Sequence, residues 1–159
     1  MKATRNILIF VCAVVAACGL GNVKADFTFG EPVKFGSVAY SGDLIDCFSA
    51  DGLEMYIQSR RAGGQGDYDM WVSRRASPDD VWGPPENLGP AVNSPQWDGF
   101  ASISTDGLSL YFISSVGQAD LLATDLYVTT RATKNDPWGP AVSLGPTVNG
   151  TRQDLSRFE

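Results

Sequence analysis

Two carboxylates that are close enough in sequence to bind one metal ion lie in the segment Asp67-Tyr68-Asp69. Carboxylates one residue apart offer hard oxygen ligands of the kind that Ca²⁺ prefers. The segment lacks the further oxygen donors of a calcium loop, and Asp69 also stands where a strand is expected to start. We therefore keep Asp67 and Asp69 only as weak metal candidates, and we expect no metal and no cofactor.

Aromatic and basic side chains around the same segment are candidates for ligand contact. Trp97 follows Pro95 and is not repeated elsewhere in the chain, so it is a candidate for stacking on a sugar or contacting a partner. Tyr68 and the pair Arg60-Arg61 are further candidates. Paired arginines beside a loop are, however, more simply explained as a solvated rim than as a substrate clamp.

Several kinds of catalytic site are excluded because the chain contains no histidine. A Ser-His-Asp or Cys-His pair and a histidine-ligated metal all need an imidazole. The acids Asp51 and Asp106 each precede a glycine in a tight turn, which is a structural position rather than that of a general acid or base. We predict no catalytic residue.

The composition is that of one folded domain: 159 residues, 43% hydrophobic and 19% charged. Its 17 glycines and nine prolines indicate frequent turns and short strands. Three of the 12 basic residues, Lys2, Arg5 and Lys24, lie in a segment that we expect to be removed, which leaves nine against 18 acidic ones, a net charge of −9. Such a charge disfavours binding to nucleic acid.

Residues 1–25 are predicted to be an export signal. Lys2 and Arg5 form a basic start, residues 7–17 are almost continuously apolar, and residues 23–25 put small side chains before a cleavage site. The apolar run is shorter than the roughly 20 residues that span a bilayer. We therefore expect no transmembrane span in the mature chain.

The expected cleavage lies between Ala25 and Asp26, which makes the protein secreted or periplasmic. An alternative is a lipobox that ends at Cys18, in which case lipid on Cys18 would anchor the protein to a membrane. Outside the signal Cys47 is the only cysteine, so no intramolecular disulfide is available. We expect Cys47 to be a small buried apolar residue.

An internal repeat organises the rest of the chain. Residues 69–97 and 125–153 are identical at 13 of 29 positions at a spacing of 56. Upstream, Asp51-Gly52 recurs as Asp106-Gly107 at a spacing of 55. Repeats of this length are typical of propeller blades.

Each repeat is predicted to form four antiparallel strands. The first three are expected over 46–49, 53–59 and 70–73, and in the second repeat over 100–104, 108–114 and 126–130. The fourth follows Trp82 or Trp138 and runs to about Leu88 or Leu144, with Pro84 and Pro140 at its start. The Asp-Gly pairs make tight hairpins, since glycine accepts positive φ. Both faces of 108–114 are largely apolar, which predicts a sheet packed between two others.

The repeat resembles a known family. The pattern Ser-x-Asp-Gly-x-x-x-Tyr-hydrophobic-x-Ser, the segment 67–73 and the Trp-Gly-Pro tail are similar to the WD40-like β-propeller repeat of exported bacterial proteins, related to the propeller of the Tol-system periplasmic protein TolB. The resemblance covers about residues 29–149. It implies structural roles at the repeated positions, which are Asp51, Gly52, Asp69, Trp82, Asp106, Gly107, Asp125 and Trp138.

The fold class implied is all-β, an incomplete propeller. We expect a partial propeller over 26–159, with a surplus outer strand at 29–36, blade 1 over 46–97, blade 2 over 98–149 and the start of a further repeat at 150–159. Propellers usually close with about four to eight blades. The chain is therefore expected to be a truncated member of a longer family, or a homo-oligomer in which several copies close one ring.

The expected function is that of an exported, non-catalytic module that binds or scaffolds a protein or a cell-envelope glycan. A propeller hydrolase acting on glycans through Asp and Glu side chains is the alternative. A chain with no independent function is a third possibility.

Overall fold

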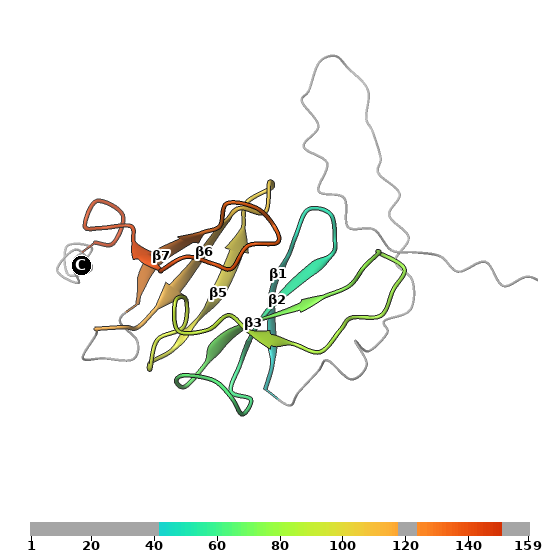
Figure 1. Cartoon of the computed structure of the whole chain (residues 1–159). Coiled ribbons are helices and arrows are strands. Elements are labelled where there is room, and N and C mark those ends of the chain that lie inside the picture. The colour runs from blue at the N-terminus through green and yellow to red at the C-terminus, as the bar shows by residue number, and fades with distance from the viewer. Residues whose placement is uncertain (1–41, 118–123, 151–159) are drawn as a thin grey trace, which may run out of the picture. The chain divides into compact units, whose positions relative to one another are not determined.

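The structure, a computed structural model, describes residues 42–117 and 124–150. Within these ranges the fold is all-β, with no helix, and its strands lie in two sheets side by side (Figure 1). The predicted signal with its cleavage site, Cys18, the surplus strand at 29–36 and the predicted repeat start beyond residue 150 lie outside the described residues. No helix in the described ranges is long and apolar enough to cross a membrane.

Each sheet is an antiparallel meander of four strands in chain order. Sheet 1 consists of β1 (Leu44–Phe48), β2 (Glu54–Ser59), β3 (Asp69–Arg74) and β4 (Glu86–Asn87). Sheet 2 consists of β5 (Asp98–Ile103), β6 (Ser109–Ser114), β7 (Asp125–Thr130) and β8 (Val142–Ser143). The prediction of two four-stranded antiparallel units in an all-β chain is confirmed.

The two sheets have the same register. Tyr56 pairs with Val72 across β2 and β3, and Tyr111 pairs with Val128 at the same place across β6 and β7. The first strand of each sheet also has a register shift of the kind made by a β-bulge. The sequence repeat is therefore a structural repeat down to individual strand pairs.

The Asp-Gly hairpins are built by identical local contacts. The Asp51 carboxylate accepts a hydrogen bond from the Ser49 hydroxyl at 2.6 Å and one from the backbone N–H of Leu53 at 3.1 Å. Asp106 accepts the corresponding bonds in the second repeat. Gly52 and Gly107 have φ of 70° and 76°, the left-handed region that favours glycine.

The main hydrophobic core lies between the sheets. Its buried members are Tyr56, Met70, Val72, Val92, Ala101, Leu110, Phe112 and Trp138. A smaller cluster of Met55, Ile57 and Trp82 lies on the opposite face of β2. All six residues of β2 are buried, whereas in β6 burial alternates and Tyr111 is exposed. Within the described residues sheet 1 covers one face of β6, and the other face carries the exposed Tyr111. That both faces of 108–114 are covered therefore stays a prediction.

The fourth strand of each sheet is shorter than predicted. The strands proper are Glu86–Asn87 and Val142–Ser143. One further backbone bond in each sheet, from Leu88 N–H to Met70 O at 3.1 Å and from Leu144 N–H to Leu126 O at 3.0 Å, reaches the predicted end of the strand. Pro84 and Pro140 precede these strands rather than starting them, because proline has no N–H to give to a ladder. The stretch before β4 is instead tied to β3 by the bond from Gly83 N–H to Arg74 O, at 2.8 Å.

Candidate functional site

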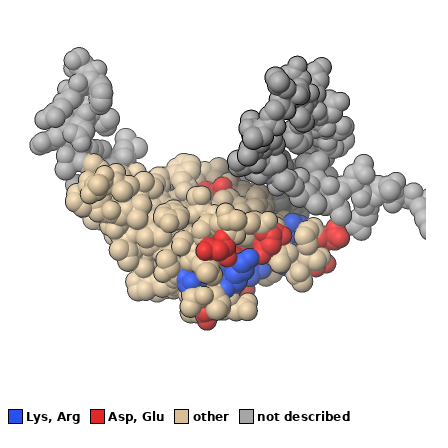
Figure 2. All heavy atoms as spheres, turned by 90° about the horizontal axis from the view of Figure 1, so that it is seen from above, with Lys and Arg blue, Asp and Glu red and all other residues tan. Residues whose placement is uncertain are grey.

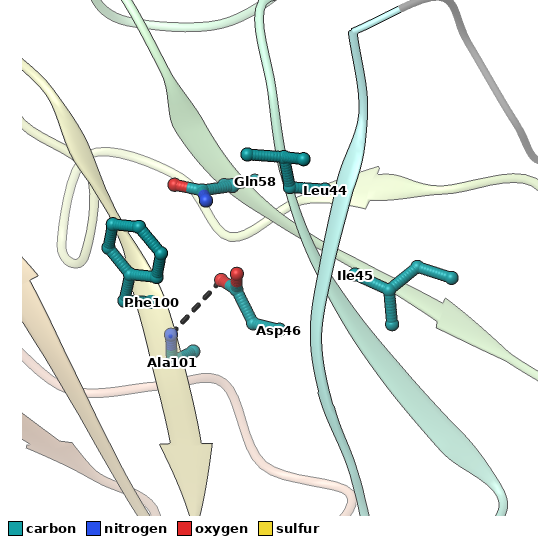
Figure 3. A pocket seen from close by; sticks show the side chains of 6 residues that line it. All are labelled: Leu44, Ile45, Asp46, Gln58, Phe100 and Ala101. Atoms are coloured by element: carbon teal, nitrogen blue, oxygen red, sulfur yellow. Dashed lines mark hydrogen bonds between the residues drawn. The ribbon is translucent and has the colours of Figure 1, made fainter.

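A pocket of about 300 Å³ opens where β1 of sheet 1 approaches β5 of sheet 2 (Figure 3). Three strands position its walls, since β1 and β2 supply residues from sheet 1 and β5 supplies those from sheet 2. The described lining residues are Leu44, Ile45, Asp46, Gln58, Phe100 and Ala101. The wall is mostly apolar and carries one carboxyl and one amide group.

Asp46 connects the two sheets at this pocket. Its carboxylate accepts a hydrogen bond from the backbone N–H of Ala101 at 3.0 Å (Figure 3). Burial raises the pKa of Asp46 to about 6, although the Ala101 hydrogen bond acts in the opposite direction. No basic side chain of the described residues forms an ion pair with it. The pocket therefore contains a carboxyl group that changes its charge in mildly acidic solution.

Gln58 supplies the amide group. The residue is only 1% exposed, and its side-chain oxygen has no hydrogen-bond partner within the described ranges. It extends toward β5, as the Asp46 carboxyl does (Figure 3). A Cβ on Gly99 would overlap this amide, so glycine at position 99 allows β5 to approach β2. The amide oxygen lies against Gly99 at the back of the pocket, as a buried polar atom without a protein partner.

Phe100 forms the open aromatic wall. The residue is 59% exposed, and its φ of 51° makes it the one non-glycine residue with positive φ in the described chain. It lies within the register shift of β5, between Gly99 and Ser102. A large side chain in this conformation is strained, and such strain concentrates at binding and catalytic sites.

The predicted ligand-contact residue Trp97 lies next to this wall. Its ring meets that of Phe100 edge to face, with centroids 5.3 Å apart. Tyr68 is close by through the main chain, since its carbonyl accepts the N–H of Asp98 at 2.9 Å. The Arg60 guanidinium lies 4.3 Å from the centre of the Tyr68 ring. The structure thus brings Trp97, Tyr68 and Arg60 to the end of the sheets where β5 begins.

The remaining candidates are occupied by contacts within the protein. Arg60 forms an ion pair with Asp67 at 2.7 Å, and Arg61 forms one with Asp43. Asp69 is the first residue of β3, and its carboxylate accepts N–H groups of the preceding loop and of Asn87. A cation at Asp67 and Asp69 would have to displace these partners. The described residues contain no group of three or more His, Cys, Asp or Glu side chains arranged for a metal.

A network of charges joins the sheets at their opposite end. Figure 2 looks onto the end with the β1–β2 and β5–β6 turns and shows acidic and basic side chains next to each other. Arg131 holds both carboxylate oxygens of Glu54, at 2.6 and 3.1 Å, and Lys134 binds Asp51 at 2.6 Å. The network therefore connects sheet 2 to sheet 1 at the end away from the pocket.

Reasoning from the sequence missed Asp46, Gln58 and Phe100. The repeat offers little signal for them, because most other positions of these strands also differ between its two copies. At a spacing of 55, Asp46 and Gln58 correspond to Ala101 and Ile113, and Phe100 corresponds to Ile45.

No family model, no curated protein and no solved structure matches this chain.

Proposed function

We propose that this protein is a non-catalytic binding module that takes a glycan of the cell envelope in the pocket between β1 and β5. The observation that supports this proposal is the exposed Phe100 ring beside the carboxyl of Asp46 and the amide of Gln58. A sugar presents hydroxyl groups that can bond a carboxylate and an amide, together with an apolar C–H face that can lie on an aromatic ring. Trp97 extends the aromatic wall for a second sugar ring.

Binding is favoured over hydrolysis by the number of acids in the pocket. Glycoside hydrolysis generally uses two carboxyl groups that flank the bond to be cleaved. Among the described lining residues Asp46 is the single acid. One carboxyl group can orient a ligand but does not supply both an acid and a nucleophile or base.

We also propose that the chain is exported and belongs to the WD40-like β-propeller repeat group. Support comes from the two four-stranded meanders with matched registers and matched Asp-Gly turns. The basic and apolar character of residues 1–25 supports export. The N-terminal sequence and mass of the exported protein test this part, because they distinguish cleavage before Asp26 from a lipid-modified Cys18.

Binding to a panel of neutral oligosaccharides and peptidoglycan fragments tests the proposed ligand. In Asp46→Asn the amide keeps the shape of the side chain but removes its charge, and we expect the dissociation constant of the best ligand to rise about tenfold, as for the loss of one charge-assisted hydrogen bond. Phe100→Leu should weaken binding by removing the ring. Asp106→Asn is the matched control, since this carboxyl lies in a turn at the other end of the sheets.

Three results would contradict the proposal. The first is that no member of the panel binds. The second is that Asp106→Asn weakens binding as much as Asp46→Asn. The third is turnover of a glycan that a single carboxyl substitution abolishes, which would favour the hydrolase alternative instead.

A further inference from the structure

Sheet 1 directs two carboxyl groups toward sheet 2, and they have different partners there. Glu54 is held by both terminal nitrogens of Arg131, at 2.6 and 3.1 Å. Asp46 accepts the backbone N–H of Ala101 at 3.0 Å, and no Lys or Arg side chain of the described residues forms an ion pair with it. A backbone N–H is a dipole without net charge, so within the described part of the chain the Asp46 carboxylate has no counter-ion.

The pKa values of the two acids reflect this difference. Burial acts to raise the pKa of Glu54, but the hydrogen bonds and the charge of Arg131 hold it below its ordinary value. At Asp46 burial prevails and raises the pKa to about 6, against the effect of the Ala101 hydrogen bond. A cation bound beside Asp46 would favour the charged form and offset the cost of burying it. The pocket is therefore suited to a positively charged ligand.

The rest of the pocket wall indicates the kind of cation. Next to Asp46 the wall consists of the open ring of Phe100 and the aliphatic side chains of Leu44 and Ile45 (Figure 3). An exposed aromatic ring attracts an ammonium group through its negative face. A metal ion such as Ca²⁺ needs several oxygen ligands, and Asp46 is the single acid among the described lining residues. The wall thus favours an organic ammonium group over a metal ion.

We propose that this pocket recognises a sugar with a free amino group, that is, a hexosamine without an acetyl group. The inference rests on the proposed function, because it takes the ligand to be a glycan. The protonated amine would bond the Asp46 oxygen that does not accept the Ala101 N–H, and the C–H face of the sugar would lie on Phe100. Acetylation removes the positive charge of the amine, so an acetylated sugar would lose the ion pair with Asp46.

Binding of two matched disaccharides tests this specificity by titration calorimetry at neutral pH. The probes are the disaccharide of glucosamine and that of N-acetylglucosamine, which differ in their acetyl groups alone. We expect the wild type to bind the amino form about tenfold more tightly or better, as for one hydrogen bond between charged groups.

Three variants separate the pocket from general attraction between a cation and an acidic protein. Asp46→Asn should bind the two disaccharides equally, because its amide has no charge. Phe100→Leu should weaken binding of both. Asp106→Asn is the matched control, because it removes the same charge from an exposed turn, and it should keep the wild-type preference.

The inference is overturned if the acetylated disaccharide binds as tightly as the amino form, or if Asp106→Asn removes the preference as Asp46→Asn does. It is overturned as well if Nα-acetyl-lysine amide binds as tightly as the amino disaccharide, since the amine would then be recognised without a sugar. If neither disaccharide binds but a neutral glycan of the panel does, this inference alone fails. If no glycan binds at all, the proposed function fails with it.

Discussion

The carboxylate of Glu54 in β2 is held by both terminal nitrogens of Arg131, which follows β7. The arginine side chain has no exposed surface, and its guanidinium lies 4.4 Å from the centre of the Trp138 ring. The Tyr56 hydroxyl donates a further hydrogen bond to Glu54 at 3.0 Å. One carboxylate from the first repeat is thus bound inside the second repeat, 77 residues further along the chain.

Replacing Glu54 by glutamine should strongly destabilise the fold. The variant leaves the buried Arg131 charge without a counter-ion, which typically costs about 3 kcal/mol or more in the free energy of unfolding. Urea unfolding at neutral pH measures this loss. Glu86→Gln is the matched control, because Glu86 binds Arg74 at an exposed position and its loss should cost less than about 1 kcal/mol. Equal effects of the two substitutions would contradict the role of the buried pair.

The same pair predicts a dependence on acid. Burial by itself would raise the pKa of Glu54, but the hydrogen bonds and the charge of Arg131 outweigh it and hold this pKa below its ordinary value. The stabilisation is therefore present above the pKa of an unfolded glutamate and is lost as the pH falls through the lower, folded value. The difference in unfolding free energy between wild type and Glu54→Gln should shrink at acidic pH.

Asp46 should have the opposite effect on stability. Its pKa is raised from 3.8 to about 6, so the protonated form favours the fold. This contribution is fully present below pH 3.8 and is lost as the pH rises to about 6. At neutral pH Asp46→Asn should therefore be more stable than the wild type, by on the order of 1–2 kcal/mol. Urea unfolding from pH 4 to pH 7 checks this, and a constant difference between the two proteins would refute it.

Adding a methyl group at Gly99 should disturb the contact between β5 and β2. The new Cβ of Gly99→Ala overlaps the Gln58 amide, and overpacking of this kind costs about 1–3 kcal/mol. Because Gln58→Ala removes the overlapping atoms, Gly99→Ala should cost less in that background. A double-mutant cycle measures the coupling. If the two substitutions simply add, the close approach has no energetic consequence.

Phe100→Gly should separate stability from binding. Glycine adopts positive φ without strain, so the substitution relieves a backbone cost on the order of 1 kcal/mol. It also removes the ring that we propose as the sugar platform. We expect an unchanged or higher melting temperature together with weaker binding of the panel glycan. A large loss of stability would show instead that the contact between Phe100 and Trp97 is needed for folding.

Local features of this fold were predictable from the sequence, whereas the pocket was not. The Asp51-Gly52 turn depends on contacts within five residues, so its pattern is visible in the chain. The repeated Val-Asn pairs make contacts that are longer in sequence but stay within one repeat. Asn93 forms hydrogen bonds with the backbone of Met70, and Asn149 forms them with the backbone of Leu126.

The pocket depends on contacts between the repeats. Asp46 meets the backbone of Ala101, 55 residues away, and no pattern within one repeat specifies that contact. The placement of Phe100 depends further on a bulge, and a bulge leaves no fixed sequence pattern. The fourth strands begin after Pro84 and Pro140, and the pattern of apolar residues did not indicate this late start.

The differences between the repeats give the pair of sheets a direction. In sheet 1, Asp46 accepts a hydrogen bond from the backbone N–H of Ala101, and Glu54 forms an ion pair with Arg131. Were the two repeats exchanged in order, neutral Ala101 and Ser109 would stand where the acids are needed, and Arg75 would have no carboxylate to bind. Sheet 1 thus supplies the carboxylates and sheet 2 the N–H groups of the contact between them. The two repeats are therefore not interchangeable in their order along the chain.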